Sequence, residues 1–174
     1  MSVIDTLKSQ ALTFNQLQFY VGNRQTKRCR WITYDDLKRF RSIDELMELG
    51  AVVILLQIEK LNVPKVGHFI VLLDHGSHYE HFDSYGITMD EELELTKEHH
   101  LTNIFRQSNK KIVDNDTRLQ TFREDINTCG RWVVARLLLR QIELDDFLKL
   151  FIHLKPQTPD EMVVVFTLLL QYDK

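Results

Sequence analysis

The sequence predicts an α+β fold, in which a small mixed sheet packs on a long apolar helix and further helices lie outside. Three observations support this. Apolar residues recur at helical spacing near the start of the chain, β-rich runs with a hairpin pattern fill its middle, and an apolar, proline-free helix follows residue 129. Helices, then strands, then helices is an order typical of α+β proteins.

The composition is that of a globular protein. Hydrophobic residues make up 44% of the 174, and Gly and Pro together number only nine, so we expect one domain over residues 1–174. A net charge of −3 argues against wholesale nucleic-acid binding. The longest apolar run, 51–56, is far shorter than the roughly 18 residues of a membrane helix. Two cysteines and no signal-peptide pattern predict a reducing, intracellular, non-secreted setting.

The first half of the chain should contain two helices and a strand. Residues 13–20 carry apolar side chains at helical spacing, and Gly22 can end that helix. A capping box at 42–45, with the glutamate reaching back to the serine amide, should open a short helix that Gly50 stops. The β-branched run 51–58 has the character of a central strand buried on both faces.

A hairpin should follow this strand. Two β-rich runs within residues 67–86 flank Gly76-Ser77, and glycine first in a two-residue loop favours a type II′ turn. The valines of the last segment also permit a strand. For the rest of the chain we expect a short strand at 112–113 and helices over 90–100, 129–141, 145–154 and 159–171.

The predicted turn makes opposed residue numbers sum to 153, so His68 faces Tyr85. Asp83 then lies diagonally, roughly 7–8 Å away between backbones, within reach of a carboxylate–imidazole hydrogen bond. Glu80 falls on the opposite face, and Asp74 lies roughly 20 Å along the same strand. Asp83 is therefore the acid that can orient His68.

Cys129 is the candidate nucleophile because it follows two N-cap residues, 127–128, and opens the apolar helix. The helix dipole and free amides there favour the thiolate. Gly130 should let a substrate carbonyl approach, so that the Cys129 amide can bind an oxyanion, with Gln120 or alternatively Gln107 as a second donor. With the His–Asp pair this indicates a cysteine hydrolase. An inert core cysteine and a structural histidine remain the alternative.

The order Gly67-His68, then F-D-S-Y-G at 82–86, a glutamine, and N-T-C-G-R-W at 127–132 resembles the adenain-type cysteine proteases. That clan includes the adenovirus maturation protease and the SUMO- and ubiquitin-like-protein-specific proteases. The strongest resemblance is to the maturation proteases predicted in virophages, Polinton elements and large DNA viruses. It covers about residues 31–141. The chain departs from the pattern in two ways: Phe69 stands where the family has Trp, and the glutamine-to-cysteine interval is longer than usual.

The resemblance implies a papain-like or adenain-like fold with Cys129 as nucleophile, His68 as general base, Asp83 as orienting acid and Gln120 in the oxyanion hole. It implies no metal and no organic cofactor. The substrates would be viral capsid or other virion precursor proteins, cut during maturation after a small residue such as Gly. We expect a monomer in the virion and in the cytoplasmic virus factory of the infected cell.

Two other functions stay open. A deubiquitinase or SUMO-type isopeptidase would share the chemistry but need a surface for a ubiquitin-like partner. A non-enzymatic, capsid-associated protein could contact nucleic acid through the segment 24–41, which holds seven of the 22 basic residues. That segment could equally be a solvated loop and helix face.

Cys29 and the histidines of the predicted hairpin are two further candidate sites. Cys29 lies among basic residues that would stabilise its thiolate, so it is either a second reactive thiol, a disulfide partner for an activating peptide as the resemblance implies, or a loop cysteine. His75, His78 and His81, with Asp74 and Asp83, suggest a metal site only superficially, because strand alternation points His78 and His81 to opposite faces.

Overall fold

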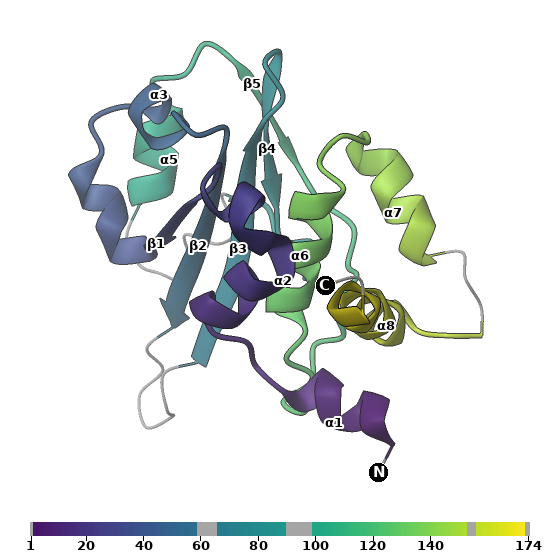
Figure 1. Ribbon diagram of the computed structural model, residues 1–174. Helices are drawn as coiled ribbons and strands as arrows, with labels where there is room; N and C mark the ends of the chain where they lie inside the picture. The colour runs from purple at the N-terminus through teal and green to yellow at the C-terminus, as the bar shows by residue number, and fades with distance from the viewer. Residues whose placement is uncertain (1, 59–65, 90–98, 153–155, 173–174) are drawn as a thin grey trace.

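A five-stranded sheet forms the centre of the computed structural model, which describes residues 2–58, 66–89, 99–152 and 156–172 (Figure 1). Its strands lie in the order β1-β2-β3-β4-β5. The outer pairs β1–β2 and β4–β5 are parallel, and the inner pairs are antiparallel. The strands are β1 Arg30–Thr33, β2 Ala51–Ile58, β3 Val66–Asp74, β4 His78–Phe82 and β5 Lys111–Asp114. The small mixed sheet predicted from the sequence is confirmed.

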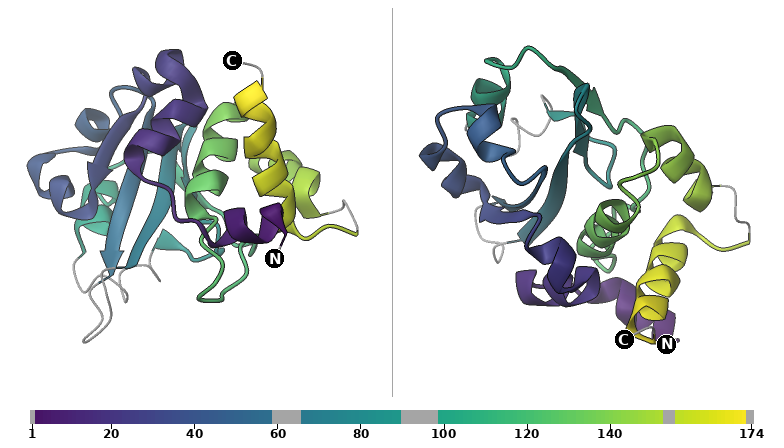
Figure 2. Two further views of the ribbon diagram at one scale, coloured as in Figure 1. Left: turned by 60° about the horizontal axis from the view of Figure 1, so that its bottom comes forward. Right: turned by 45° about the horizontal axis from the view of Figure 1, so that its top comes forward.

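Helices cover both faces of this sheet (Figures 1 and 2). On one face the central helix α6 contacts β3, and α2 and α8 pack against α6. The short elements η1, α3 and α5 share the other face through a second apolar cluster. The first group comprises α1 Val3–Ser9, α2 Phe14–Thr26, α6 Cys129–Leu138, α7 Leu144–Ile152 and α8 Pro159–Tyr172, and the second η1 Tyr34–Arg39, α3 Ile43–Leu46 and α5 His100–Phe105.

Strand alternation divides the core into these two clusters. Val53 and Val71 lie in the cluster under α6, whereas Ile54 and Ile70, one residue along, belong to the cluster under α5. Since both faces of β2 are buried, the central strand over Ala51–Ile58 is confirmed with its predicted bounds.

The hairpin has the predicted register. Val71 pairs with Phe82 and Leu72 with His81, so opposed numbers sum to 153. Gly76 takes a φ of 81°, which favours glycine, and the amide of His75 donates to the carbonyl of His78 across the turn. This register directs the side chain of His68 toward the segment that follows β4.

Several local predictions need correction. Gly22 does not end its helix: φ of 78° bends the chain there, and the helix resumes to Thr26. Glu45 accepts from the amide of Arg41 rather than of Ser42, so the capping box is incomplete and α3 ends at Leu46. The helix expected over 159–171 is confirmed as α8, so the strand that its valines also permitted does not form. Most of the helix expected over 90–100 lies outside the described residues.

Candidate active site

His68 and Asp83 form a buried pair. The Nε2 atom of His68 lies 2.8 Å from an oxygen of Asp83, and both side chains are almost fully enclosed. The imidazole also stacks on the ring of Tyr85, with centroids 4.7 Å apart. The predicted diagonal pairing across the hairpin is thus confirmed, and the Asp83 contact leaves Nδ1 as the ring nitrogen available to another partner.

Asp83 is held in place at both its carboxylate and its backbone. Its second oxygen accepts a hydrogen bond from the Tyr85 amide at 2.6 Å. Its backbone carbonyl accepts from the side chain of Asn115 at 2.6 Å. Gly86, at φ 69°, turns the chain away so closely that a Cβ would meet the backbone of Thr117 at 2.7 Å. The orientation of Asp83 therefore depends on the tight turn after β4.

Cys129 is the first residue of α6, as predicted, and it lies beside His68. The thiol hydrogen-bonds with the imidazole and accepts from the backbone amides of Phe69 and Gly130. Burial would raise the pKa of this thiol, but the hydrogen bond and charge of His68 hold it below its ordinary value. The same geometry acts on the imidazole. Burial would lower the pKa of His68, and the Asp83 carboxylate raises it well above its ordinary value.

These two opposite shifts favour a thiolate–imidazolium pair. Each charge lowers the energy of the other, and the amides at the start of α6 add donors that only an anion uses fully. A buried thiol in this state is a nucleophile with its proton already transferred.

A buried carboxylate from α8 fixes the loop that leads to Cys129. Asp160 accepts from the hydroxyl of Thr128 at 2.5 Å and from the amide of Thr121 at 2.9 Å. The hydroxyl of Thr128 is therefore not a helix cap, and the first-turn amides of α6 receive no side-chain cap. Asn127 ties the same loop to α1 through the carbonyls of Lys8 and Ser9.

Gln120 lies beside this site with its amide already bonded. Its Nε2 donates to the hydroxyl of Tyr85 at 3.0 Å and to the carbonyl of Ile126 at 3.1 Å, and its oxygen accepts from Ser84 at 2.8 Å. Gln107, the alternative, is exposed just after α5, on the opposite face of the sheet from α6.

One expectation about a neighbour of the site is wrong. Gly130 does not open space for substrate, because a Cβ there would meet Leu17 at 3.0 Å and Leu12 at 3.2 Å. The glycine instead lets α2 pack closely on α6. Phe69, which stands where the adenain-type proteases of the sequence resemblance have Trp, is buried with its ring edge-on to Phe14 at 5.3 Å.

Cys29 is also not the reactive loop thiol that its sequence neighbours suggest. It is buried in the cluster under α6, and its sulfur donates to the carbonyl of Arg30. Burial raises the pKa of Cys29 to about 12. Its basic neighbours Arg24, Lys27 and Arg28 are exposed.

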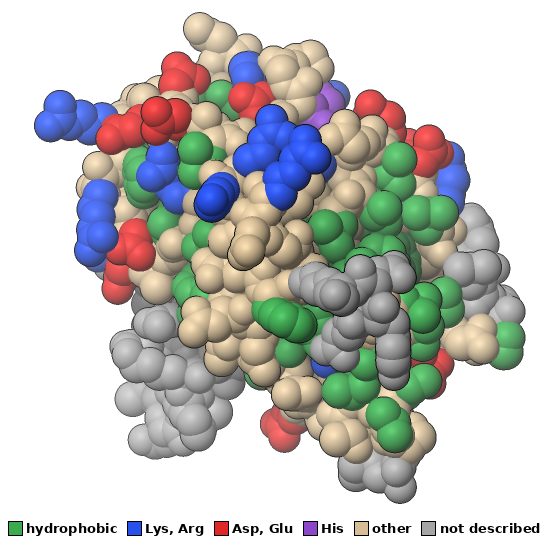
Figure 3. Space-filling model, in the orientation of Figure 1, with side chains coloured by type: hydrophobic (Ala, Val, Ile, Leu, Met, Phe, Trp, Pro, Cys, Tyr) green, Lys and Arg blue, Asp and Glu red, His purple; other side chains and the backbone are tan. Residues whose placement is uncertain are grey.

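The basic segment 24–41 is partly neutralised. Arg30 pairs with Glu48, Lys38 with Asp35 and Arg39 with Asp36. Arg24, Lys27 and Arg28 form no ion pair within the described part of the chain. Figure 3 shows Lys and Arg side chains gathered toward the top of one face.

The histidines of the hairpin are engaged separately. His75 stacks on His78 with centroids 4.8 Å apart and contacts Glu80 at 3.0 Å, while His81 pairs with Asp114 at 3.0 Å. Within the described ranges, no group of three His, Cys, Asp or Glu side chains is placed to hold a metal ion. In the same ranges, no helix has the length and apolar character to cross a membrane.

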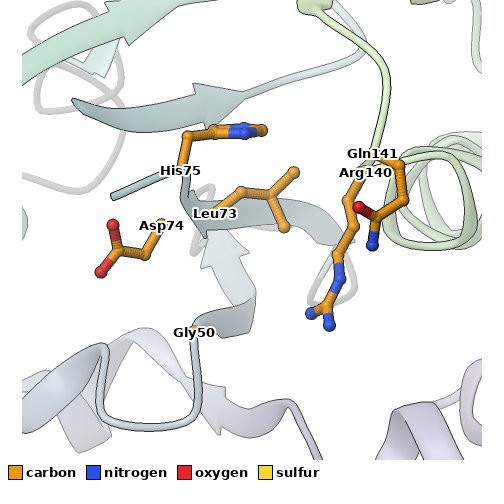
Figure 4. Close-up of a pocket in the computed structure, with 6 residues that line it drawn as sticks. All are labelled: Gly50, Leu73, Asp74, His75, Arg140 and Gln141. Atoms are coloured by element: carbon orange, nitrogen blue, oxygen red, sulfur yellow. The ribbon is translucent and has the colours of Figure 1, made fainter. Parts of the chain in front are cut away.

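A pocket of about 330 Å³ opens at the turn end of the hairpin, away from His68 (Figure 4). Polar groups of β3, the turn and the residues after α6 line most of it, and none of the predicted site residues contributes. The lining residues are Gly50, Leu73, Asp74, His75, Arg140 and Gln141.

Sequence reasoning missed three supporting residues. Asp160 belongs to the last helix, and no sequence pattern indicates that its carboxylate binds the loop before Cys129. Asn115 and the hydroxyl of Tyr85 also had no assigned role. Tyr85 alone carried a signal, because the hairpin register already placed it opposite His68.

The chain is similar to known proteins in sequence and in fold. No model of a known protein family matches the chain. The uncharacterized protein V9 of Sputnik virophage is 29% identical over 152 residues, which cover 79% of this chain and 85% of that protein. The pS273R protease of ASFV superposes with a TM-score of 0.50 at 13% identity, over 95% of this chain and 69% of that one. The SUMO protease Ulp1 gives a TM-score of 0.46 at 13% identity, over 98% and 82%.

The likeness to the pS273R protease is one of fold. It confirms the predicted fold class, a mixed sheet packed on a central helix that begins at Cys129, with flanking helices. The chain therefore has the fold of a protease, and its cysteine, histidine and aspartate meet within that fold.

Proposed function

We propose that the protein is a cysteine endopeptidase in which Cys129 is the nucleophile, His68 the general base and acid, and Asp83 the group that orients His68. The observation that carries the proposal is the buried contact chain from Asp83 through His68 to the Cys129 thiol, at the start of a helix. The protease fold supports it independently.

The reaction begins with the thiolate. The Cys129 sulfur attacks the peptide carbonyl carbon, and the carbonyl π electrons move to oxygen to give an oxyanion. As the first helical residue, Cys129 has a backbone N–H without an intrahelical acceptor, which can bind this oxyanion. The C–N bond then breaks, and the proton on His68 passes to the leaving amine.

The second half releases the acyl group. Neutral His68 takes a proton from water, and the hydroxide attacks the thioester carbon. Collapse of this intermediate breaks the C–S bond and returns the thiolate–imidazolium pair. Asp83 keeps its charge throughout, because its role is to hold the ring through Nε2 and stabilise the imidazolium.

For substrate we propose a viral precursor protein, such as a capsid precursor, cut during maturation in the virion or virus factory. The similarity to a virophage protein and to the fold of a viral protease supports this choice. A ubiquitin-like substrate is the competing outcome.

The test is cleavage of a capsid precursor by the purified protein, with a ubiquitin-like fusion as the competing substrate. Cys129→Ala and His68→Ala should each lower cleavage by at least about a thousandfold. His99→Ala, which removes an exposed histidine, is the matched control and should keep full activity. Cleavage that survives Cys129→Ala would refute the proposed chemistry, and cleavage of the fusion alone would refute the proposed substrate.

A further inference from the structure

The oxyanion hole needs a side-chain donor besides the Cys129 amide, and the hydrogen bonds of Gln120 show whether it can be that donor. An amide nitrogen has two protons, and both protons of Gln120 are given to acceptors, the Tyr85 hydroxyl and the Ile126 carbonyl. The orientation of this amide is fixed, because a carbonyl such as that of Ile126 can only accept. Gln120 therefore has no proton left for a substrate oxygen.

The Tyr85 hydroxyl, in contrast, still has a proton to donate. It accepts from Gln120 at 3.0 Å, and the part of the chain that the structure describes offers no acceptor for its own proton. Its ring is half-buried, stacked on the imidazole of His68 on one side and packed edge-on against Phe122 at 5.2 Å on the other.

Burial and the nearby negative charge of Cys129 raise the pKa of Tyr85 to about 12. The hydroxyl consequently keeps its proton throughout the neutral range. A hydrogen bond received from Gln120 also polarises the O–H bond, which strengthens it as a donor.

We propose that Tyr85 supplies the side-chain donor of the oxyanion hole and that Gln120 acts through it as a positioning residue. This inference rests on the proposed function. The donated hydrogen bond stabilises the oxyanion that forms when Cys129 attacks, and no proton leaves Tyr85. Gln120 holds the hydroxyl in place, and Ile126 and Ser84 hold Gln120.

Tyr85→Phe tests this directly, because it keeps the ring stacked on His68 and removes only the hydroxyl. With a fluorogenic peptide amide that has glycine at the scissile bond, we expect kcat to fall about a hundredfold with KM unchanged. Alkylation of Cys129 by iodoacetamide should stay within about twofold of wild type, because that reaction develops no oxyanion.

Tyr79→Phe is the matched control. Its hydroxyl bonds to Asp44 at the far end of the hairpin, so both rates should be unchanged. A Tyr85→Phe variant that keeps its kcat overturns the inference. So does one whose alkylation slows as much as its cleavage, since the effect would then pass through the thiolate–imidazolium pair.

Gln120→Ala separates the two possible donors. If Gln120 acts through Tyr85, its loss lowers kcat about tenfold in the wild type and less than about twofold in Tyr85→Phe. If Gln120→Ala lowers kcat by the same factor in the wild type and in Tyr85→Phe, Gln120 is a direct donor and the inference is overturned. If the wild type neither cleaves the peptide nor labels at Cys129, the protease proposal itself fails, and this inference falls with it.

Discussion

Cys29 and Cys129 are buried to nearly the same extent, 4% and 7% exposed, and both lie in the apolar cluster under α6. Their thiol pKa values nevertheless move in opposite directions. Burial raises that of Cys29 to about 12, while His68 overcomes the same burial effect at Cys129 and lowers it. Fixed donors and a fixed opposite charge decide the reactivity of a thiol here, since burial is common to both.

The contrast also shows why charge in the sequence misleads. Cys29 has basic neighbours along the chain, but Arg24, Lys27 and Arg28 extend into solvent, where water screens their charge. Cys129 takes its cation from His68, which lies far away in sequence and is held in place by Asp83. Proximity in space, with both groups buried, is what shifts a pKa.

The largest expected effect is the difference in labelling between the two thiols. At pH 7, iodoacetamide should alkylate Cys129 at least about 10³-fold faster than Cys29, because only a minute fraction of Cys29 is thiolate with a pKa of about 12. Peptide mass spectrometry of the native protein measures both rates. The comparison breaks if Cys29 reacts within tenfold of Cys129.

Asp83→Asn should make Cys129 more like Cys29. Removing the carboxylate leaves burial uncompensated, so the pKa of His68 falls. In the wild type the imidazolium is present below the raised pKa and is lost as pH rises through it. In the variant this loss should begin at least about one pH unit lower, and alkylation at pH 7 should fall about tenfold or more.

Asp114→Asn is the control for this pH profile. It alters a second His–Asp pair of the same sheet, in which Asp114 of β5 contacts His81 instead of His68. The pH at which Cys129 alkylation and activity fall on the alkaline side, the alkaline limb of the profile, should be the same as in the wild type. If Asp83→Asn also leaves that limb unmoved, Asp83 does not tune His68.

The elements that local rules govern could be predicted from the sequence. A two-residue turn sets the hairpin register, and strand alternation then pairs His68 with Asp83. The start of α6 at Cys129 was predicted from the N-cap residue types before it, although the Thr128 hydroxyl bonds to Asp160 and does not cap the helix. The bonds of Asp160 and Gln120 could not be predicted, because Asp160 reaches Thr121 and Thr128 across 39 and 32 residues and no periodic pattern encodes such contacts.

The two thiols differ as well in what holds their backbone. The loop before Cys129 depends on Asp160, so Asp160→Asn, which removes the charge and one of the two acceptor oxygens, should lower the free energy of unfolding by about 1–3 kcal/mol. It should reduce kcat while the pH dependence of Cys129 labelling is unchanged. Glu161→Gln, one residue on and partly exposed, should cost less than about 1 kcal/mol. Equal losses in the two variants would argue against a specific clamp.

Cys29→Ala should have the smallest effect. The substitution removes a buried sulfur that contributes packing and a weak bond to the Arg30 carbonyl, so the free energy of unfolding should fall by about 1 kcal/mol. Peptide cleavage should stay within about twofold of wild type, because no contact links Cys29 to His68 within the described residues. Thermal unfolding and kcat on the same preparation measure both quantities. A tenfold loss of kcat with folding intact would instead show that Cys29 supports the site, and equal burial would then no longer separate an inert thiol from a reactive one.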